Sequence, residues 1–573
     1  MAASLWTALD PLGHLLQFLL WALDFTVWLV SIVGPCQFFA AAVRSRLGWG
    51  GGALSSFECD AATKSRRGLS AVEADFDWRD PQWRCATMHE VWAKAVAQHG
   101  PVRCAGTRDF LGVHTPAFAR GQASWGQAGQ RGRGAGQPLN VFGDVGWKTY
   151  SEVGEAAASF GKGLHALGLQ PLSLAKSRAV TDGFGRLVGP HALLIFEDTC
   201  EEWSTAMLGA LGQGLVVATS YSTLGVASVA EMVQELGIAV LLCNYAAVPA
   251  MVALLEVCPT LRHVVYTRHK VDHGAPSISE SIGYPASSKY YPGRLANASV
   301  VSFDEVVLAG RESALEASAH LPTEEHLALV MYTSGTTGKP KGVMLKHSAL
   351  VAAVKALRHY LQEAGCNRDP KQQEVYLAYL PAAHILEFVL QVAMLTLGAA
   401  VGFSDPLSIS PRGGLTKRAQ DGALIHQGGL QVFRPTVLVG VPKVWDLLKR
   451  GVEAQLVHQA GPLARAVFKA CLAVRSRALQ LGRSSPVASL AFGDAYEVLG
   501  GRVKLCLCGG GPLAPQVQNF IRVAFGVNLV QSYGLTETAG VGTAQPPKDV
   551  QVRGKKGHHR TPHTHTLPSQ RRG

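Results

Sequence analysis

The residues whose types and spacing are best suited to chemistry lie in one short segment, residues 333–343, which reads TSGTTGKPKGV. An apolar run, LALVM at residues 327–331, leads directly into it. The three glycines allow backbone N–H groups to approach a ligand closely, while the hydroxyl groups and two lysines add donors and positive charge. Together these groups suit a bound polyphosphate.

This segment differs from a Walker A loop. That motif places four residues between its first glycine and a Gly-Lys pair, which Ser or Thr then follows. Here only two threonines separate Gly335 from the next Gly-Lys pair, and Pro340 follows that pair. The alternative of an ordinary polar turn between strands is disfavoured because hydroxyl groups, glycines and lysines are so dense.

The same segment resembles the phosphate-binding loop of the adenylate-forming superfamily, which includes acyl-CoA synthetases, luciferases and the adenylation domains of peptide synthetases. Three further segments match motifs of the family in the family's order: LPAAHILE at 380–387, GGGPL at 509–513 and QSYGLTET at 531–538. The segment RPTVLVGVPKVWD at 434–446 is similar to the long-chain acyl-CoA synthetases. The resemblance covers roughly residues 147–543.

The resemblance implies that most of the matched residues bind ATP. Tyr533 would offer a flat face on which adenine stacks, and the glycines at 509–511 would let the purine edge approach the backbone. Thr536 would hydrogen-bond to phosphate oxygens. The residues implied to contact the nucleotide are Thr333, Ser334, Gly335, Thr336, Thr337, Gly338, Lys339, Lys341, Gly509, Gly510, Gly511, Tyr533, Gly534 and Thr536.

Three matched residues are implied to act on the reacting groups. Glu537 would coordinate a Mg²⁺ that bridges the phosphates, and Lys341 would bring positive charge to them. His384 would lie where family members place the substrate carboxylate; the alternative is a histidine whose hydrogen bonds are satisfied within the core. Phe388 falls near the family's acyl gate, although core packing explains an apolar residue there equally well.

The resemblance implies a two-step reaction that uses ATP, Mg²⁺ and CoA. The carboxylate of a long-chain fatty acid attacks the α-phosphorus of ATP, giving an acyl-adenylate and pyrophosphate, and the CoA thiol then displaces AMP to form a thioester. The leading hypothesis is therefore a long-chain fatty acid–CoA ligase. Two alternatives stay open: a catalytically silent, membrane-tethered isoform that binds nucleotide or lipid, and an adenylate-forming ligase for another carboxylic acid such as a hydroxycinnamate.

Short β-branched and aliphatic runs recur along the chain and predict the strands of an α/β fold. Helical stretches such as residues 227–236 separate the first three runs, which is the pattern of a parallel sheet. Ligands gather outside the carboxyl ends of such strands, so the residues that follow them are candidates for the site. With the resemblance, this pattern predicts a large N-terminal adenylation domain whose parallel or mixed sheets are flanked by helices. The runs lie at 192–196, 215–220, 239–244, 263–267, 327–334, 375–381, 436–442, 503–510 and 528–534.

Composition divides the chain into segments. The Gly/Gln/Arg tract at 119–138 cannot bury a core and predicts a solvated, disordered insert, and residues 173–190 are interpreted as a second insertion. The family's ribose-binding Asp, hinge and catalytic Lys are not found after Glu537, so we expect an incomplete domain that lacks the C-terminal small lobe. The predicted divisions are an N-terminal segment 1–24, a membrane-inserted segment 25–43, a linker 44–77, an AMP-binding domain 78–545 and a basic, disordered tail 546–573.

The 573 residues include 53 Lys and Arg against 41 Asp and Glu, a net charge of +12. Such a surplus favours anionic partners such as nucleotides, CoA or lipid headgroups. The few RG steps of residues 119–138 do not make an RNA-binding segment, so no nucleic acid partner is expected. The eleven cysteines are scattered without paired CxxC spacing, which predicts reduced, mostly buried thiols in a cytosolic domain rather than disulfides or a zinc site.

Residues 25–43 are 19 residues without Lys, Arg, Asp or Glu, close to the roughly 20 apolar residues that span a bilayer as a helix. Basic residues follow from Arg44 onward, which by the positive-inside rule places the rest of the chain in the cytosol. The expected membrane is that of the endoplasmic reticulum. Gly34 and Pro35 interrupt the segment, so an interfacial or hairpin insertion stays an alternative to a single span. A signal peptide is disfavoured because no basic residue precedes the segment.

The full chain should resist carbonate extraction from membranes, because residues 25–43 would hold it in the bilayer. A shortened chain that begins at Ser70 should be recovered in the soluble fraction. Fractionation followed by immunoblotting measures both chains side by side. Recovery of the full chain in the soluble fraction would show that this segment is not an anchor.

Overall fold

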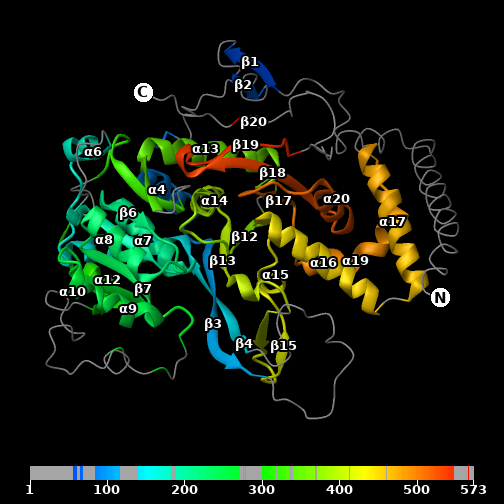
Figure 1. Ribbon diagram of the computed structural model, residues 1–573, viewed down its shortest axis with the longest axis horizontal. Coiled ribbons are helices and arrows are strands. Elements are labelled where there is room, and N and C mark those ends of the chain that lie inside the picture. The colour runs from blue at the N-terminus through cyan, green and yellow to red at the C-terminus, as the bar shows by residue number, and fades with distance from the viewer. Residues whose placement is uncertain are drawn as a thin grey trace.

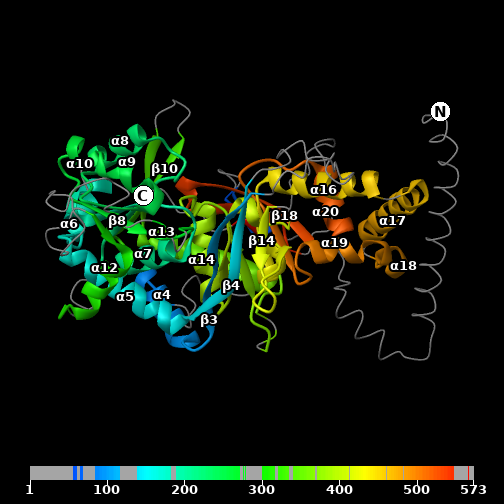
Figure 2. The same ribbon diagram turned by 90° about the horizontal axis from the view of Figure 1, so that it is seen from below.

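The computed structural model describes most of the chain. Only the backbone is described for residues 56–60, 65–68, 455–459, 493–494 and 565–566, and for Ser334 and Pro340. Two sheets with their helices lie side by side, one at one end of the molecule and the other toward its middle (Figures 1 and 2). The described residues are 84–115, 138–181, 189–271, 275, 278, 300–315, 321–334, 340–367, 369, 371–411, 413–459, 461–481 and 483–547.

The first sheet has seven strands, and all neighbours are parallel except the β10–β11 hairpin. The chain passes from the central strand β5 to β6 on one side, and then to β7 on the other side. The strands predicted at 192–196, 215–220, 239–244, 263–267 and 327–334 are thereby confirmed. In spatial order they are β11 (Pro340–Lys346), β10 (Leu327–Ser334), β6 (Val216–Thr219), β5 (Ala192–Phe196), β7 (Val240–Asn244), β8 (His263–Thr267) and β9 (Val300–Ser302).

Helices cover both faces of this sheet, which is why its central strands are continuous apolar runs. Leu193 and Ile195 of β5 pack with α5, α7 and α12, whereas Leu194 and Phe196 pack with α8 and α9 on the opposite face. The helices are α4 (Met88–His99), α5 (Tyr150–Ala166), α6 (Leu174–Thr181), α7 (Glu201–Gly212), α8 (Val226–Leu236), α9 (Val248–Val252), α10 (Leu254–Val257) and α12 (Phe303–Glu312).

The second sheet has eleven strands, and β13, β12, β16, β17 and β18 form its parallel centre. The runs predicted at 375–381, 436–442, 503–510 and 528–534 supply four of these five strands. In spatial order the strands are β15 (Leu424–His426), β14 (Gly414–Lys417), β4 (Leu139–Thr149), β3 (Arg103–His114), β13 (Ala400–Phe403), β12 (Val375–Ala378), β16 (Val437–Gly440), β17 (Leu505–Cys508), β18 (Asn528–Leu535), β19 (Gly540–Ala544) and β20 (His565–Thr566).

Helix α14 is buried along its whole length, and its apolar residues share one core cluster with strands of both sheets. The remaining helices cover the second sheet, with α17 at the end of the molecule farthest from the seven-stranded sheet (Figure 1). They are α13 (His347–Glu363), α14 (Ile385–Thr396), α15 (Gly429–Phe433), α16 (Pro442–Gln459), α17 (Pro462–Gln480), α18 (Pro486–Ser489), α19 (Gly493–Val498) and α20 (Pro515–Ala524), together with the 3₁₀ turn η6 (Thr536–Thr538). Strands β1 (Ser56–Asp60) and β2 (Ser65–Gly68) pair with each other.

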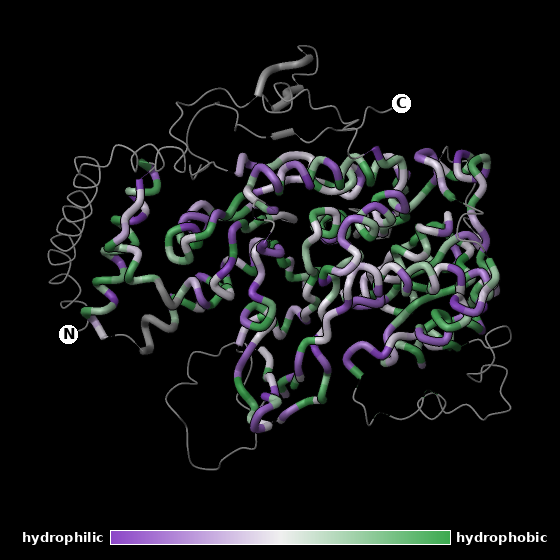
Figure 3. Tube along the Cα trace, turned by 180° about the vertical axis from the view of Figure 1, so that it is seen from behind, coloured by the Kyte–Doolittle hydropathy of each residue, from purple (hydrophilic) through white to green (hydrophobic). Residues whose placement is uncertain are grey.

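Part of the predicted insertion at 173–190 is packed against the first sheet. Residues 174–181 form α6, and the buried Ser177 hydroxyl accepts a hydrogen bond from the Leu327 N–H of β10 at 2.7 Å. The predicted anchor at 25–43 and residues 119–137 of the predicted solvated insert lie outside the described residues. Among the described helices, none is both long and apolar enough to cross a membrane. Hydrophilic and hydrophobic residues are interspersed along outer helices such as α17 (Figure 3).

Helices α5 and α12 approach each other so closely that their contact requires glycine. A Cβ atom on Gly310 would lie 1.6 Å from the Ser159 carbonyl oxygen, and one on Gly163 would lie 2.0 Å from the Val306 carbonyl oxygen. Both obstacles are backbone atoms, so neither can turn aside. Any side chain at these positions would push the two helices apart.

Gly310→Ala should therefore lower the free energy of unfolding by roughly 2–4 kcal/mol, because overpacking outweighs the gain in helix propensity. The control is Gly451→Ala in α16, where nothing lies within 4 Å of the added Cβ. This control should stabilise the protein by roughly 0.5–1 kcal/mol. Thermal and urea unfolding measure both variants. Equal stability of the two variants would show that the helices separate at no cost.

Candidate active site

The β10–β11 hairpin carries the segment 333–343. Thr333 is paired with Lys341 across the hairpin, and Ser334 is paired with Pro340, so the two ends of the connecting loop are held together. Lys341 is exposed. The loop itself, residues 335–339, lies outside the described residues. The phosphate contacts that therefore stay predictions are those of Gly335, Thr336, Thr337, Gly338 and Lys339.

A second part of the site is the turn η6 between β18 and β19. Thr536 is buried and Glu537 is exposed. The Thr538 hydroxyl accepts a hydrogen bond from the Leu535 N–H at 3.0 Å, which holds the turn closed. Strand β11 contacts η6. Glu537 therefore belongs to an element that lies against the strand of Lys341.

Strand β18 leads into this turn and carries the predicted aromatic platform. Tyr533 is 66% exposed, so its ring offers the flat face that stacking on a purine requires. Next to it, Gly534 lies so close to β19 that a Cβ would be 1.7 Å from the Gly540 carbonyl oxygen. Any side chain at Gly534 would separate the two strands that carry η6.

The glycine turn at 509–511 follows β17 directly. Gly510 has φ +76°, in the left-handed region that favours glycine. A Cβ on Gly509 would lie 2.9 Å from Leu386 Cδ2 and 3.2 Å from Ser532 Oγ. The turn is therefore wedged between the first turn of α14 and strand β18. Its backbone carries no side chain that would block a flat ligand.

His384 caps the N-terminus of α14. Its Nδ1 accepts a hydrogen bond from the Leu386 N–H at 3.2 Å, which leaves Nε2 as the protonated nitrogen of the neutral ring. Burial lowers the pKa of His384, so the imidazole is neutral near pH 7. Because Leu386 packs at Gly509, His384 and the glycine turn are neighbours at the carboxyl edge of the second sheet.

The described residues fit a nucleotide with a divalent cation. Glu537 supplies a carboxylate, the ligand type that Mg²⁺ takes, beside the strand of the cationic Lys341. Tyr533 lies on the strand that leads to Glu537, and the glycine turn adjoins that strand. The structure thus brings together Lys341, Glu537, Tyr533, Gly509 to Gly511 and His384 at adjoining elements, whereas the five loop residues lie outside its description.

Sequence reasoning missed Thr199, which holds the loop that leads to His384. Its hydroxyl donates to the Leu380 carbonyl at 2.6 Å and accepts from the Ala382 N–H at 2.7 Å. Thr199 follows β5 of the first sheet, so one hydroxyl ties the two sheets together beside the site. Its place after a predicted strand was the available signal, but no spacing connects it with residues 380–387.

Glu387, in the matched segment at 380–387, is buried and was also not predicted to have a role. The Tyr376 hydroxyl donates to it at 2.5 Å and the Gln391 amide donates to it at 2.8 Å. The Ser204 hydroxyl of α7 donates to Gln391 at 2.8 Å and extends the network to the other sheet. Burial raises the pKa of Glu387 to about 7, although both hydrogen bonds oppose the shift.

Comparison with known proteins places this geometry in a family. The family described as AMP-binding enzyme matches residues 187–566. Long chain acyl-CoA synthetase 8 of Arabidopsis thaliana is 26% identical over 82% of this chain and 59% of its own length. Long chain acyl-CoA synthetase 1 of the same plant is 30% identical over 70% of this chain and 53% of its own length. Long-chain-fatty-acid–CoA ligase 1 of Saccharomyces cerevisiae is 24% identical over 83% of this chain and 63% of its own length. The chain thus spans little more than half of the length of these relatives.

Solved structures confirm the predicted fold class. The adenylation domain of a carboxylic acid reductase from Segniliparus rugosus, in complex with AMP and a co-purified carboxylic acid, superimposes with a TM-score of 0.54. It is 17% identical and covers 81% of this chain and 62% of its own. The corresponding domain from Mycobacterium chelonae superimposes with a TM-score of 0.55. It is 16% identical and covers 86% of this chain and 67% of its own. These similarities establish the fold of an adenylation domain.

Glu387→Gln should become more stable relative to the native chain as the pH rises. The unfolded carboxyl group titrates near pH 4.3, whereas the folded one titrates at about pH 7. The native chain has this stabilisation fully below about pH 4.3 and loses it as the pH rises through 7. Between pH 4.5 and 7.5 the stability difference should shift by roughly 3 kcal/mol in favour of the glutamine variant.

Urea unfolding of the two chains at both pH values measures this shift. Glu324→Gln, at an exposed position, controls for the change in net charge. A stability difference between Glu387→Gln and the native chain that stays constant with pH would show that folding leaves the pKa of Glu387 unchanged.

Proposed function

This chain belongs to the family of AMP-binding enzymes, and on that premise we propose that it activates long-chain fatty acids with ATP for transfer to CoA. One observation carries the proposal. The hairpin strand of Lys341 contacts the turn of Glu537, and Tyr533 lies on the strand that leads into this turn. Positive charge, a carboxylate for a cation and an aromatic face are the groups that a bound nucleoside triphosphate requires.

In this proposal the chain's own residues act mainly by positioning. Thr333 and Lys341, at the mouth of the hairpin, hold the phosphates, while Tyr533 stacks on the adenine. A Mg²⁺ held by Glu537 would neutralise charge on the phosphates. Fixing the acid next to the α-phosphorus converts a bimolecular step into an effectively unimolecular one.

The neutral His384 is placed to orient the acid. With Nδ1 committed to the α14 backbone, Nε2–H is the group that can donate to a carboxylate or to an oxygen of the phosphate. A neutral donor orients the carboxylate without holding it as an ion pair, so the nucleophile keeps its reactivity. The tie between Thr199 and residues 380–382 fixes the loop that carries this donor.

A long-chain fatty acid is proposed as the substrate because of the relatives. Those named above are long-chain acyl-CoA synthetases or ligases, and the segments at 380–387 and 434–446 resemble that branch. The proposed partners are therefore a long-chain fatty acid, ATP and CoA. We further propose attachment to the endoplasmic reticulum through residues 25–43, with the domain facing the cytosol, on the charge pattern of the sequence.

Pyrophosphate release with oleate, Mg²⁺ and ATP tests the reaction. We expect oleate to raise the rate above that without acid, and a hydroxycinnamate to leave it unchanged. The opposite preference would favour a ligase for another carboxylic acid. Nucleotide binding without any acid-dependent release of pyrophosphate would favour the silent isoform.

The nucleotide site is tested separately by Thr336→Ala combined with Lys341→Ala. Each substitution removes a proposed hydrogen bond to phosphate, and the bond from Lys341 is charge-assisted. The affinity for Mg-ATP should therefore fall at least roughly tenfold. Lys346→Ala is the matched control, because Lys346 lies at the other end of β11 and pairs with Glu325 at 3.0 Å. Calorimetry measures all three chains. Unchanged affinity in the double variant would remove this hairpin from the site.

A further inference from the structure

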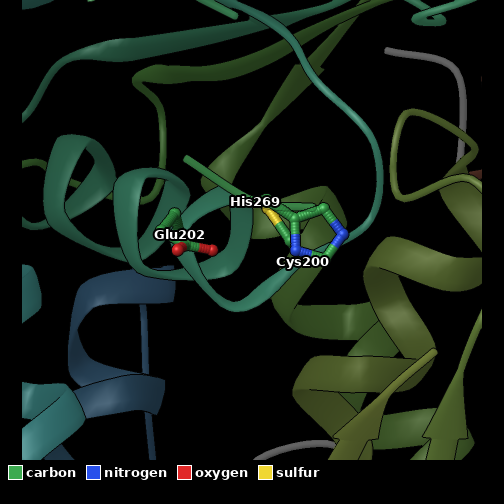
Figure 4. Close-up of side chains that lie close together, drawn as sticks. All are labelled: Cys200, Glu202 and His269. Atoms are coloured by element: carbon green, nitrogen blue, oxygen red, sulfur yellow. The ribbon is translucent and has the colours of Figure 1, made fainter. Parts of the chain in front are cut away.

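A cluster of three metal-binding side chains lies in the first sheet, apart from the nucleotide site. Ligand atoms of Cys200, Glu202 and His269 all lie within 4.8 Å of one another. Figure 4 shows the Cys200 sulfur beside the His269 ring, with the Glu202 carboxylate pointing toward them. Cys200 and Glu202 belong to the start of α7, while His269 follows β8. The cluster is therefore assembled by the tertiary fold.

The position of the cluster is one where α/β sheets commonly bind ligands. Strand β5 has β6 on one side and β7 on the other, and the chain reverses direction across the sheet there. At such a switch point the loops beyond the carboxyl ends of the strands diverge and leave room for a ligand. Cys200 and Glu202 lie beyond the end of β5, and His269 lies beyond the end of β8.

Two polar atoms of the cluster lack a protein partner. Glu202 Oε2 and His269 Nε2 are buried and accept or donate no hydrogen bond within the described part of the chain. A buried polar atom without a partner costs about 1–3 kcal/mol, and more when the group is charged. Two such atoms, on residues from different elements that lie beside one cysteine, indicate that a bound group satisfies them.

Among the described residues, no Lys, Arg or His forms an ion pair with Glu202. Lys270, the residue after His269, is already shared between Asp198 at 3.3 Å and Asp405 at 3.7 Å. Glu201, the neighbour of Glu202, is paired with Lys148 at 2.6 Å. Burial and the neighbouring Glu201 raise the pKa of Glu202. Ionising both Cys200 and Glu202 would place two negative charges together, and a positive ligand would offset them.

We propose that Cys200, Glu202 and His269 bind one Zn²⁺ ion. Thiolate sulfur, imidazole nitrogen and carboxylate oxygen are the three donor types that zinc takes in proteins. A tetrahedral zinc with bonds of about 2.0–2.3 Å separates its ligand atoms by about 3.3–3.6 Å. Since the ligand atoms lie within 4.8 Å of one another, the side chains need to close in by at most about 1.5 Å on binding. A water molecule would complete the coordination.

The protonation states of the ligands suit this ion. Burial, with the neighbouring Lys270, lowers the pKa of His269 to about 4, so its ring is neutral and free to bind metal. Burial and Glu202 raise the pKa of the Cys200 thiol, so the metal must displace its proton. The Trp203 N–H donates to Cys200 Sγ at 3.4 Å from the N-terminus of α7, an arrangement that stabilises a thiolate.

Binding at this position would also stiffen the nucleotide site. Cys200 directly follows Thr199, whose hydroxyl holds the loop that leads to His384. An ion that ties the start of α7 to the end of β8 restricts the segment that carries Thr199. The proposed zinc site does not depend on the proposed reaction.

Cobalt substitution tests the proposal on the full chain, purified in detergent, reduced and freed of metal. We expect one Co²⁺ per chain, with a sulfur-to-cobalt charge-transfer band and the visible absorption of tetrahedral cobalt, both lost when Zn²⁺ is added. Cys200→Ala should abolish the charge-transfer band. Glu202→Gln and His269→Ala should each weaken binding of both metals at least roughly a hundredfold.

Two matched variants control for buried thiols and nearby carboxylates. Cys471→Ala removes a buried thiol of α17, and Glu201→Gln removes the adjacent carboxylate; both should bind Co²⁺ as the native chain does. Because Glu202→Gln preserves shape, it carries the test if Cys200→Ala fails to fold. Absence of the charge-transfer band in the native chain, its survival in Cys200→Ala, or equal losses in Glu201→Gln and Glu202→Gln would each overturn the proposal.

Discussion

Helix α14 has no face in contact with water, because all twelve of its residues are buried. A helix that is buried on every side must lie between two layers of structure, and α14 shares one core with strands of both sheets. Its first turn delivers His384 and Leu386 to the glycine turn of the second sheet. The position of the proposed acid-binding group is therefore set by packing on the scale of the whole molecule.

Polar contacts complete what the packing begins. Thr199 holds the loop before α14 from the first sheet, and the Ser204–Gln391–Glu387–Tyr376 chain crosses the core to the second sheet. Each of these side chains forms hydrogen bonds inside the protein, where a buried donor or acceptor without a partner would cost free energy. Such contacts favour a single arrangement of the two sheets, which a purely apolar interface would define less sharply.

Burial also controls the charge of the groups near the site. It keeps the His384 imidazole neutral and raises the pKa of Glu387 to about 7, whereas Lys341 and Glu537 lie exposed to solvent. A neutral imidazole thus lies where the acid is proposed to bind, and the exposed Lys341 and Glu537 lie where the phosphates and their cation are proposed to bind. The same principle makes the cluster of Cys200, Glu202 and His269 unusual, since the pKa values of both acids are raised beside a neutral imidazole.

The sequence by itself determined the α/β class and the positions of nine strands, because an apolar run ended by glycine or a polar residue leaves few alternatives in a buried sheet. It also determined which residues carry the family's motifs, since these are local strings such as QSYGLTET. Tertiary structure alone decided that Thr199 holds the loop of His384, and that Gly310 must be glycine where α5 meets α12. It also decided that Cys200 and Glu202 meet His269, although the spacing of the cysteines in the sequence had argued against a zinc site. Such contacts join residues far apart in the chain, and only the packing of strands, helices and sheets against one another brings them together.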